Sequence, residues 1–196
     1  YDQKIKKYTI EIYSGEYHVT RNKDIVFKTL LGSCIAVCIK DRTAGVCGMN
    51  HFMLPTSKTS GNIKDIIYNG DAKYGINSME LMINKMMKLG AVRDRMRVKV
   101  FGGGEVLNSR RSNVAQSNRN FIISYLQMKR IPIIAKDLGG KTGRKIYFFP
   151  KSFKILQKKI ETSKIKKTIS REKKYHSRSA EDKNKNDKEN NLVIFN

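Results

Sequence analysis

The sequence has few cysteines and no long apolar run. Its 196 residues include three cysteines, an odd number that does not make a disulfide framework and fits a reducing compartment. The longest uncharged, apolar-rich run, residues 29–39, is far shorter than the roughly 18 residues that a membrane span needs. The first residues include lysines at positions 4, 6 and 7 and have no apolar core like that of a secretory signal. The sequence therefore predicts a cytoplasmic protein with no membrane span.

Acidic residues are scarce beside basic ones. The 17 Asp and Glu stand against 40 Lys and Arg, which gives a formal net charge of +23. Such a charge is common in proteins that bind nucleic acid or an anionic surface. Here, however, much of it is scattered singly, without an arginine-rich recognition helix or an interleaved aromatic platform. No nucleic-acid partner is expected, although binding through the basic C-terminal residues stays open as an alternative.

Short apolar segments, some of which alternate with polar residues, predict a series of short strands. They cover residues 8–12, 17–20, 25–27, 35–40, 46–53, 97–101, 131–135, 145–149 and 153–160. The segments 131–135 and 145–149 are predicted to pair around the turn at Gly139–Gly140. Residues 56–73 are polar and predict a loop.

Two helices are predicted among these strands. The clearer one covers residues 78–89, with Ser78 as N-cap candidate and Gly90 at its end. Its apolar positions, which we expect to be core, are Met79, Met82, Ile83, Met86 and Leu89. The second helix is predicted over residues 118–128. Strands interspersed with helices indicate an α+β domain, a mixed α/β layered sandwich, over residues 1–160. Residues 161–196 are predicted to be a disordered basic tail, whose apolar end, residues 192–195, is expected to dock on a partner.

Cys34 and His51 are the residues best suited to catalysis. Cys34 follows Gly32 and Ser33, so a sharp bend can display the thiol at the start of a strand, beside backbone amides that can bind an oxyanion. His51 lies on the next strand back, where an imidazole can meet the thiol across a hairpin. A thiolate with a base is the minimum apparatus for acyl transfer. From the residues alone, a buried structural cysteine stays an alternative.

Two other motifs were considered as a zinc site and as a nucleotide-binding loop, and the sequence supports neither well. Cys34, Cys38, Cys47 and His51 give four possible zinc ligands, but Cys38 lies within a predicted buried strand, whereas structural zinc ligands usually lie on short loops. We therefore predict no metal, and interpret Cys38 and Cys47 as core residues. Residues 135–142 end like a phosphate-binding loop, but residues 143–149 predict a strand where that loop needs a helix. No nucleotide or other cofactor is expected.

Several segments resemble the CheD family of chemoreceptor glutamine deamidases. They occur in the family's order: the cysteine segment 29–34, the histidine segment 48–55, Tyr74 with the methionine-rich helix that ends at 89–91, and two glycine turns at 99–104 and 137–144. Together they span residues 29–150. One departure lies at residues 114–118, where the family has a glycine after the first apolar residue.

The resemblance implies a layered α/β sandwich like that of toxin glutamine deamidases. It also implies hydrolysis of glutamine side-chain amides on chemoreceptor cytoplasmic helices, which gives glutamate and ammonia. On this basis Cys34 is expected to be the nucleophile and His51 the base. Thr29 is expected to orient the imidazole, with Gly32 and Ser33 as support. CheD proteins also bind CheC-type phosphatases, so a regulatory binding module is the alternative function.

Overall fold

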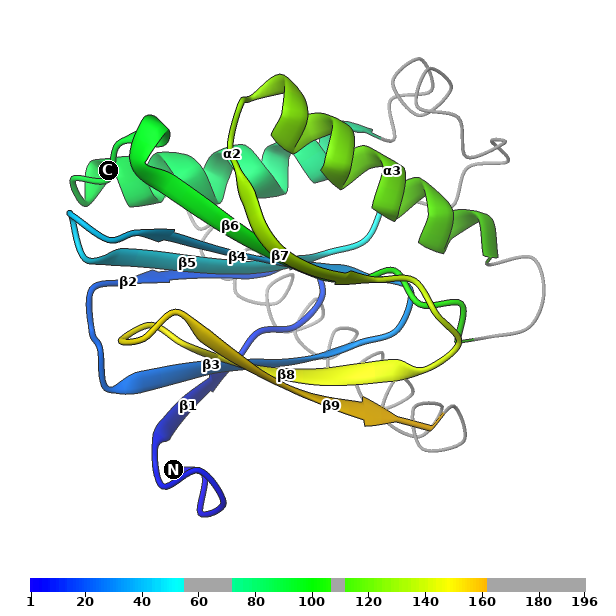
Figure 1. The fold of residues 1–196 in the computed structure, drawn as a ribbon, viewed down its shortest axis with the longest axis horizontal. Helices are drawn as coiled ribbons and strands as arrows, with labels where there is room; N and C mark the ends of the chain where they lie inside the picture. The colour runs from blue at the N-terminus through cyan, green and yellow to red at the C-terminus, as the bar shows by residue number, and fades with distance from the viewer. Residues whose placement is uncertain (55–71, 107–111, 162–196) are drawn as a thin grey trace, which may run out of the picture. The chain divides into compact units, whose positions relative to one another are not determined.

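The structure, a computed structural model, describes residues 1–54, 72–106 and 112–161. These residues belong to one compact unit, Tyr1–Thr162. Two β-sheets stack face to face, and two helices cover the outer face of one of them (Figure 1). The α+β class and the layered arrangement are therefore as predicted. Most of the predicted loop and tail, including residues 192–195, lies outside the described residues.

The sheet beneath the helices has five strands, in the order β2-β5-β4-β6-β7. Its strands are β2 (Tyr17–Thr20), β4 (Ile35–Asp41), β5 (Val46–Phe52), β6 (Met96–Gly102) and β7 (Ile133–Leu138). β4 and β5 form the predicted antiparallel hairpin, in which Ala36 lies opposite His51. Both strands are buried along their whole length, because a second sheet covers one face and helices cover the other.

The second sheet has four strands, in the order β1-β3-β8-β9. Its strands are β1 (Tyr8–Glu11), β3 (Ile25–Leu31), β8 (Gly143–Phe149) and β9 (Lys154–Ile160). The predicted pairing of residues 131–135 with 145–149 is wrong, because β7 pairs with β6 in one sheet and β8 pairs with β3 and β9 in the other. Gly139 and Gly140, with φ angles of 81° and 78°, lie where the chain crosses between the sheets.

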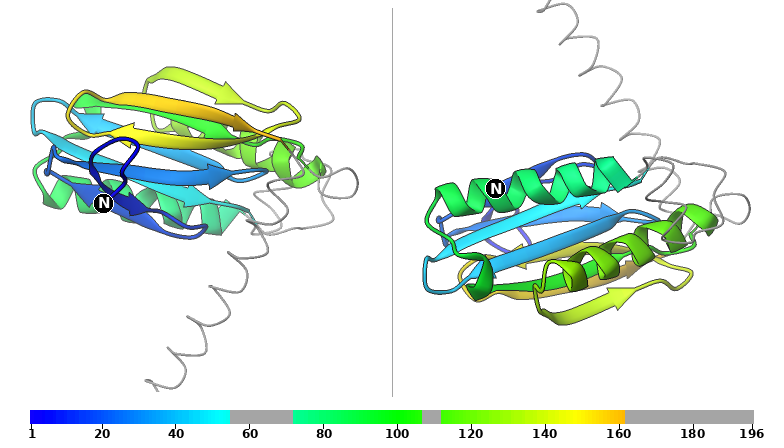
Figure 2. Two further views of the ribbon diagram at one scale, coloured as in Figure 1. Left: turned by 90° about the horizontal axis from the view of Figure 1, so that it is seen from below. Right: turned by 90° about the horizontal axis from the view of Figure 1, so that it is seen from above.

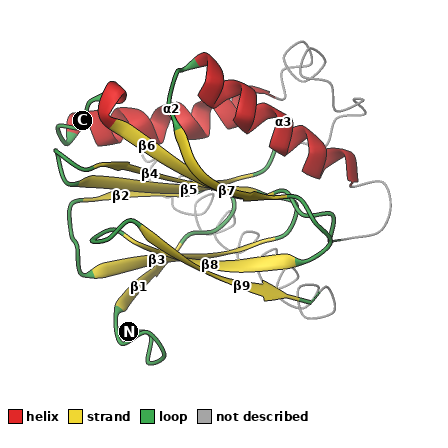
Figure 3. Cartoon of the chain, viewed as in Figure 1, coloured by secondary structure: helices red, strands yellow, loops and turns green. Residues whose placement is uncertain are grey.

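Both helices lie on the same face of the five-stranded sheet (Figures 2 and 3). Helix α2 (Ala72–Lys88) begins before the predicted start, so Ser78 lies inside it and is not its N-cap. Gly75 interrupts the apolar pattern there, yet it is buried against Phe121 and Leu54, which leave no space for a Cβ. Four of the five predicted core positions, Met79, Met82, Ile83 and Met86, are fully buried, whereas Leu89 follows the end of the helix and is only partly buried against the core.

Helix α3 (Ser112–Met128) also begins earlier than predicted. Val114, Ala115 and Asn118 are buried, and they continue the inward-facing stripe of Phe121 and Ile122 toward the N-terminus of the helix. Asn118 is polar, so this part of the stripe is not visible in a hydrophobic pattern. Among the described residues, no helix is long and apolar enough to cross a membrane.

Candidate active site

Cys34 and His51 face the space between the two sheets. Side chains alternate along a strand, and those of Ala36 and Cys38 on β4 belong to the core between the sheets. Cys34 has the same parity and packs against that core. On β5, Cys47 and Met49 belong to the same core, so His51 also faces this side. The hairpin register places the thiol and the imidazole at the same end of the sandwich.

Thr29 reaches His51 from the opposite sheet. Its hydroxyl Oγ1 lies 2.8 Å from Nδ1 of His51 and donates a hydrogen bond of 2.6 Å to the carbonyl oxygen of Ile12. Nδ1 of His51 also lies 3.3 Å from that carbonyl oxygen. Thr29 and His51 are each 1% exposed, so water competes little for these bonds. The structure thus brings the three sequence-predicted residues to one end of the sheet interface.

The contacts at Nδ1 favour one tautomer of the neutral imidazole. The Thr29 hydroxyl uses its proton on Ile12, so its oxygen accepts from His51, and the Ile12 carbonyl can only accept. Both contacts therefore require the proton on Nδ1. The other ring nitrogen, Nε2, is buried and carries the lone pair that can take a proton.

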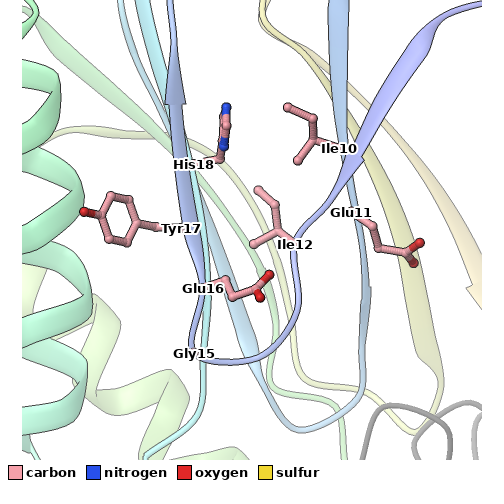
Figure 4. A pocket seen from close by; sticks show the side chains of 7 residues that line it. All are labelled: Ile10, Glu11, Ile12, Gly15, Glu16, Tyr17 and His18. Atoms are coloured by element: carbon pink, nitrogen blue, oxygen red, sulfur yellow. The ribbon is translucent and has the colours of Figure 1, made fainter. Parts of the chain in front are cut away.

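Backbone hydrogen bonds hold His51 in place. Its N–H donates to the carbonyl of Glu16 at 3.0 Å, and its own carbonyl accepts from the N–H of Gly15 at 2.7 Å. A hollow of about 390 Å³ lies beside this segment, lined by residues 10–12 and 15–18. Figure 4 shows the side chains of Ile10, Ile12 and His18 extending into the space between β1 and β2. The segment that anchors the imidazole is therefore also the wall of a surface hollow.

The loop before Cys34 is fixed through its carbonyl groups. The carbonyl of Gly32 accepts from the N–H of Gly104, and that of Cys34 accepts from the N–H of Gly103, both at 2.8 Å. Between them, the carbonyl of Ser33 accepts from Nδ2 of Asn118 at 2.8 Å. At the glycine turn 102–104, two stretches of backbone approach each other closely. Ser33 contributes to the anchoring of this loop through its main-chain carbonyl.

Arg144 supports the glycine turns from beneath. Its side chain is 2% exposed, and its guanidinium donates to the carbonyls of Gly102, at 2.6 Å, and of Gly139. A third bond of 3.0 Å goes to the carbonyl of Asp137. A planar guanidinium with five donors suits this cluster of carbonyl acceptors, which a lysine would not fill. Arg144 thereby links the two glycine turns to each other, and Gly103 and Gly104 of the first turn bond to the loop that carries the thiol.

The other two cysteines lie in a different setting. Cys38 and Cys47 are buried among apolar side chains, as predicted, and Cys34 is half-buried. Burial raises the pKa of the Cys38 thiol strongly and that of Cys47 to about 11. Both therefore stay protonated and unreactive at neutral pH. Within the described ranges, no three His, Cys, Asp or Glu side chains are grouped so that they can hold a metal ion.

Replacing Gly102 with alanine is expected to destabilise the protein by at least about 2 kcal/mol. A Cβ at this position would lie 2.1 Å from the carbonyl oxygen of Cys34, and the φ angle of 118° disfavours any side chain. The midpoint of urea unfolding measures the effect. Gly45→Ala is the matched control, since its φ is 66° but nothing lies within 4 Å of a Cβ there. Equal losses in both variants would show that the contact with Cys34 is unimportant.

Several site residues were not predicted from the sequence. The carbonyl of Ile12 and the N–H groups of Gly103 and Gly104 belong to the backbone, which has no signature in side-chain chemistry. Arg144 lies in the segment 137–144, in which the glycines were the residues that indicated a turn. Asn118 is the last residue of the segment 114–118, which departs from the family pattern, and a polar residue in the buried stripe of a helix is the signal that points to it.

Comparisons with known proteins give one consistent result. A family profile described as CheD chemotactic sensory transduction matches residues 53–159. The "probable chemoreceptor glutamine deamidase CheD 2" of Chromobacterium violaceum is 44% identical over 164 residues, which are 83% of this chain and 79% of that protein. A "probable chemoreceptor glutamine deamidase CheD" of Bordetella avium is 37% identical over 185 residues, 93% of this chain and 80% of that protein.

Among solved structures, a Neisseria meningitidis protein of the DUF152 family is 9% identical, and the match covers 71% of this chain and 65% of that one. Its TM-score of 0.37 is too low to support an argument. The relatives, in contrast, are similar over most of their length, and their alignments extend beyond the residues that the family profile matches. On the strength of these relatives and of the profile match, the chain belongs to the CheD family.

Proposed function

We propose that this protein is a chemoreceptor glutamine deamidase. It hydrolyses the side-chain amide of particular glutamines on chemoreceptor cytoplasmic helices, and Cys34 is the nucleophile. The observation that carries the proposal is the hydrogen-bonded arrangement of Thr29, His51 and the carbonyl of Ile12. It lies at the end of the sheet interface where β4 begins, directly after Cys34. The names of the relatives supply the substrate class. A cytoplasmic location is proposed with it, since none of the three cysteines forms a disulfide.

In the first step, Nε2 of His51 takes the proton of the Cys34 thiol. The thiolate attacks the amide carbon of the glutamine, and the carbonyl oxygen becomes an oxyanion. Because the carbonyls of Gly32, Ser33 and Cys34 are already bound, the amides of this loop are held in place and are our candidates for binding that oxyanion. His51 then returns the proton to the leaving nitrogen, the carbon–nitrogen bond breaks, and ammonia departs.

The second step releases the product. The acyl group is now a thioester on Cys34, and water attacks its carbon while Nε2 of His51 removes a proton from the water. The carbon–sulfur bond breaks, the sulfur regains the proton, and glutamate is formed. Thr29 keeps the imidazole in one orientation and stabilises the proton on Nδ1 in both steps. No cofactor is required, because the thiol, the imidazole and water account for every bond and proton in the two steps.

Thr29→Val is expected to lower kcat about tenfold. Valine keeps the shape of the threonine side chain but loses the hydrogen bond that orients the imidazole. The bond from Oγ1 to the carbonyl of Ile12 is lost with it. Steady-state deamidation of a receptor fragment measures the effect. Thr29→Ser keeps the hydroxyl and serves as the control, which should retain most of the activity. An unchanged kcat in Thr29→Val would remove Thr29 from the site.

Mass spectrometry of a receptor cytoplasmic fragment incubated with the protein tests the function itself. Each deamidated glutamine gains the mass difference between an amide and a carboxylate, and peptide mapping locates it. The full-length chain should modify a few particular glutamines. Absence of any mass change, with the Cys34 thiol intact and the protein folded, would contradict the proposal.

The alternative function, a regulatory module that binds a CheC-type phosphatase, stays a prediction. It does not exclude deamidation, since one protein can do both. An intact Thr29, His51 and Cys34 arrangement favours the enzyme, because docking alone does not need a buried imidazole beside a hydroxyl.

A further inference from the structure

Asn118 is a buried amide whose two ends bind both halves of the candidate site. It lies on α3 and is 0% exposed. Its Oδ1 accepts from the N–H of Leu54 at 2.8 Å, and its Nδ2 donates to the carbonyl of Ser33 at 2.8 Å. Ser33 directly precedes Cys34, and Leu54 lies three residues after His51. One side chain therefore connects the segment of the thiol to the segment of the imidazole.

The chemistry of these two bonds requires an amide. Oδ1 must accept and Nδ2 must donate, and only asparagine or the longer glutamine has both groups at one side-chain end. Aspartate would turn an acceptor toward the Ser33 carbonyl, and leucine would leave both backbone groups without their bonds. A buried polar group without a hydrogen-bond partner is strongly unfavourable, so these two hydrogen bonds hold the amide of Asn118 firmly in one orientation.

The position of Asn118 in α3 argues against a role in packing alone. Its neighbours on the buried face of the helix are apolar, among them Val114, Phe121 and Ile122. An apolar residue would fit such a stripe without the need for hydrogen bonds. The bond of Asn118 to Ser33 lies between the two glycine N–H bonds that hold Gly32 and Cys34. The amide thus fixes the middle of the loop whose ends the backbone already fixes.

We infer that Asn118 is a positioning residue for the thiol reaction. It sets the plane of the peptide between Ser33 and Cys34, and through it the direction of the Cys34 side chain and N–H relative to His51. The inference deepens the proposed function and rests on it for the reaction. Its first test, however, is the reactivity of the Cys34 thiol, which can be measured without any receptor.

The test compares three variants of the full chain. Asn118→Leu removes both hydrogen bonds at similar volume, and Asn118→Asp keeps the acceptor for Leu54 but loses the donor to Ser33. Asn50→Leu is the matched control. Asn50 is equally buried and also joins a helix to the sheet, since it bonds to the N–H of Val37 and the hydroxyl of Ser78, but it faces away from the thiol.

Three quantities are measured for each variant: the rate of Cys34 alkylation by iodoacetamide against pH, kcat and KM for a receptor fragment, and the melting temperature. In both Asn118 variants we expect Cys34 to be alkylated about tenfold more slowly at pH 7, with a profile displaced to higher pH. The fall in kcat should exceed any rise in KM. Asn50→Leu should lose melting temperature but keep the wild-type alkylation profile.

The inference is overturned if Asn118→Asp, once folded, is alkylated at the wild-type rate. It is also overturned if Asn50→Leu slows alkylation by the same factor as Asn118→Leu, because the effect would then follow lost stability. If Asn118→Leu does not fold, Asn118→Asp decides. A wild-type protein that leaves receptors unmodified would overturn the proposed function, and the alkylation rates would still decide the role of Asn118.

Discussion

Cys34→Ala is expected to abolish deamidation while the protein keeps its fold. Removal of the nucleophile from a thiol or hydroxyl hydrolase lowers kcat on the order of 10⁴- to 10⁶-fold, because no other group can form the covalent intermediate. Cys34 is half-buried at the edge of the core, so the loss of its sulfur should change the free energy of unfolding little. Receptor deamidation followed by mass spectrometry and urea unfolding measure the two effects.

Cys38→Ala is the matched control for this result. Cys38 is fully buried between the sheets, and its thiol stays protonated because burial raises its pKa. Its loss should destabilise the fold by about 1 kcal/mol or more and leave kcat near the wild-type value. Iodoacetamide should label Cys34 before Cys38 and Cys47. Deamidase activity in Cys34→Ala, or labelling that favours the buried thiols, would remove Cys34 from the mechanism.

His51→Ala is expected to lower kcat by roughly 10²- to 10⁴-fold, the usual contribution of a general base. The thiol should also become less reactive at neutral pH. An imidazolium beside the sulfur stabilises the thiolate and lowers the thiol pKa, so without it the alkylation profile should move up toward the ordinary value of about 8.5. The rate of Cys34 alkylation measured from pH 5 to about 9 follows this shift.

His18→Ala is the control for this prediction. His18 lies on β2, and its ring packs edge-on against Phe27 at 5.2 Å. Burial lowers the pKa of His18, which disfavours its charged form. Its loss should leave the alkylation profile unchanged. Identical profiles in the wild type and in His51→Ala would end the assignment of the pair.

The glycine turns show why a CheD-like sequence can be recognised from short segments. The turn at residues 102–104 touches the Cys34 loop, and the turn at Gly139–Gly140 is tied to the first through Arg144. Segments that are far apart in the chain are therefore packed around one loop. We therefore expect substitutions in any of these segments to disturb the contacts of the same loop.

Local sequence patterns were sufficient to predict several of the helices and strands. Period-two alternation indicated strands such as β6, and the hairpin of β4 and β5 followed from two adjacent apolar-rich segments and the short turn between them. Alternation within each strand shows which of its own residues share a face, but the register of β4 with β5 is what puts Cys34 and His51 on the same face. The buried methionines of α2 followed from helical spacing.

The sheet that each strand joins could not be predicted from local pattern, because most strands pair with partners that are distant in sequence. β7 and β8 are close in the chain and lie in different sheets, which no local pattern shows. Two sheets stacked face to face bring Thr29 of β3 against His51 of β5, with the carbonyl of Ile12 beside both. Asn118 and Gly75 interrupt the apolar patterns of their helices because each is suited to a contact with another element. A hydrophobic pattern indicates which positions are buried but does not show such contacts.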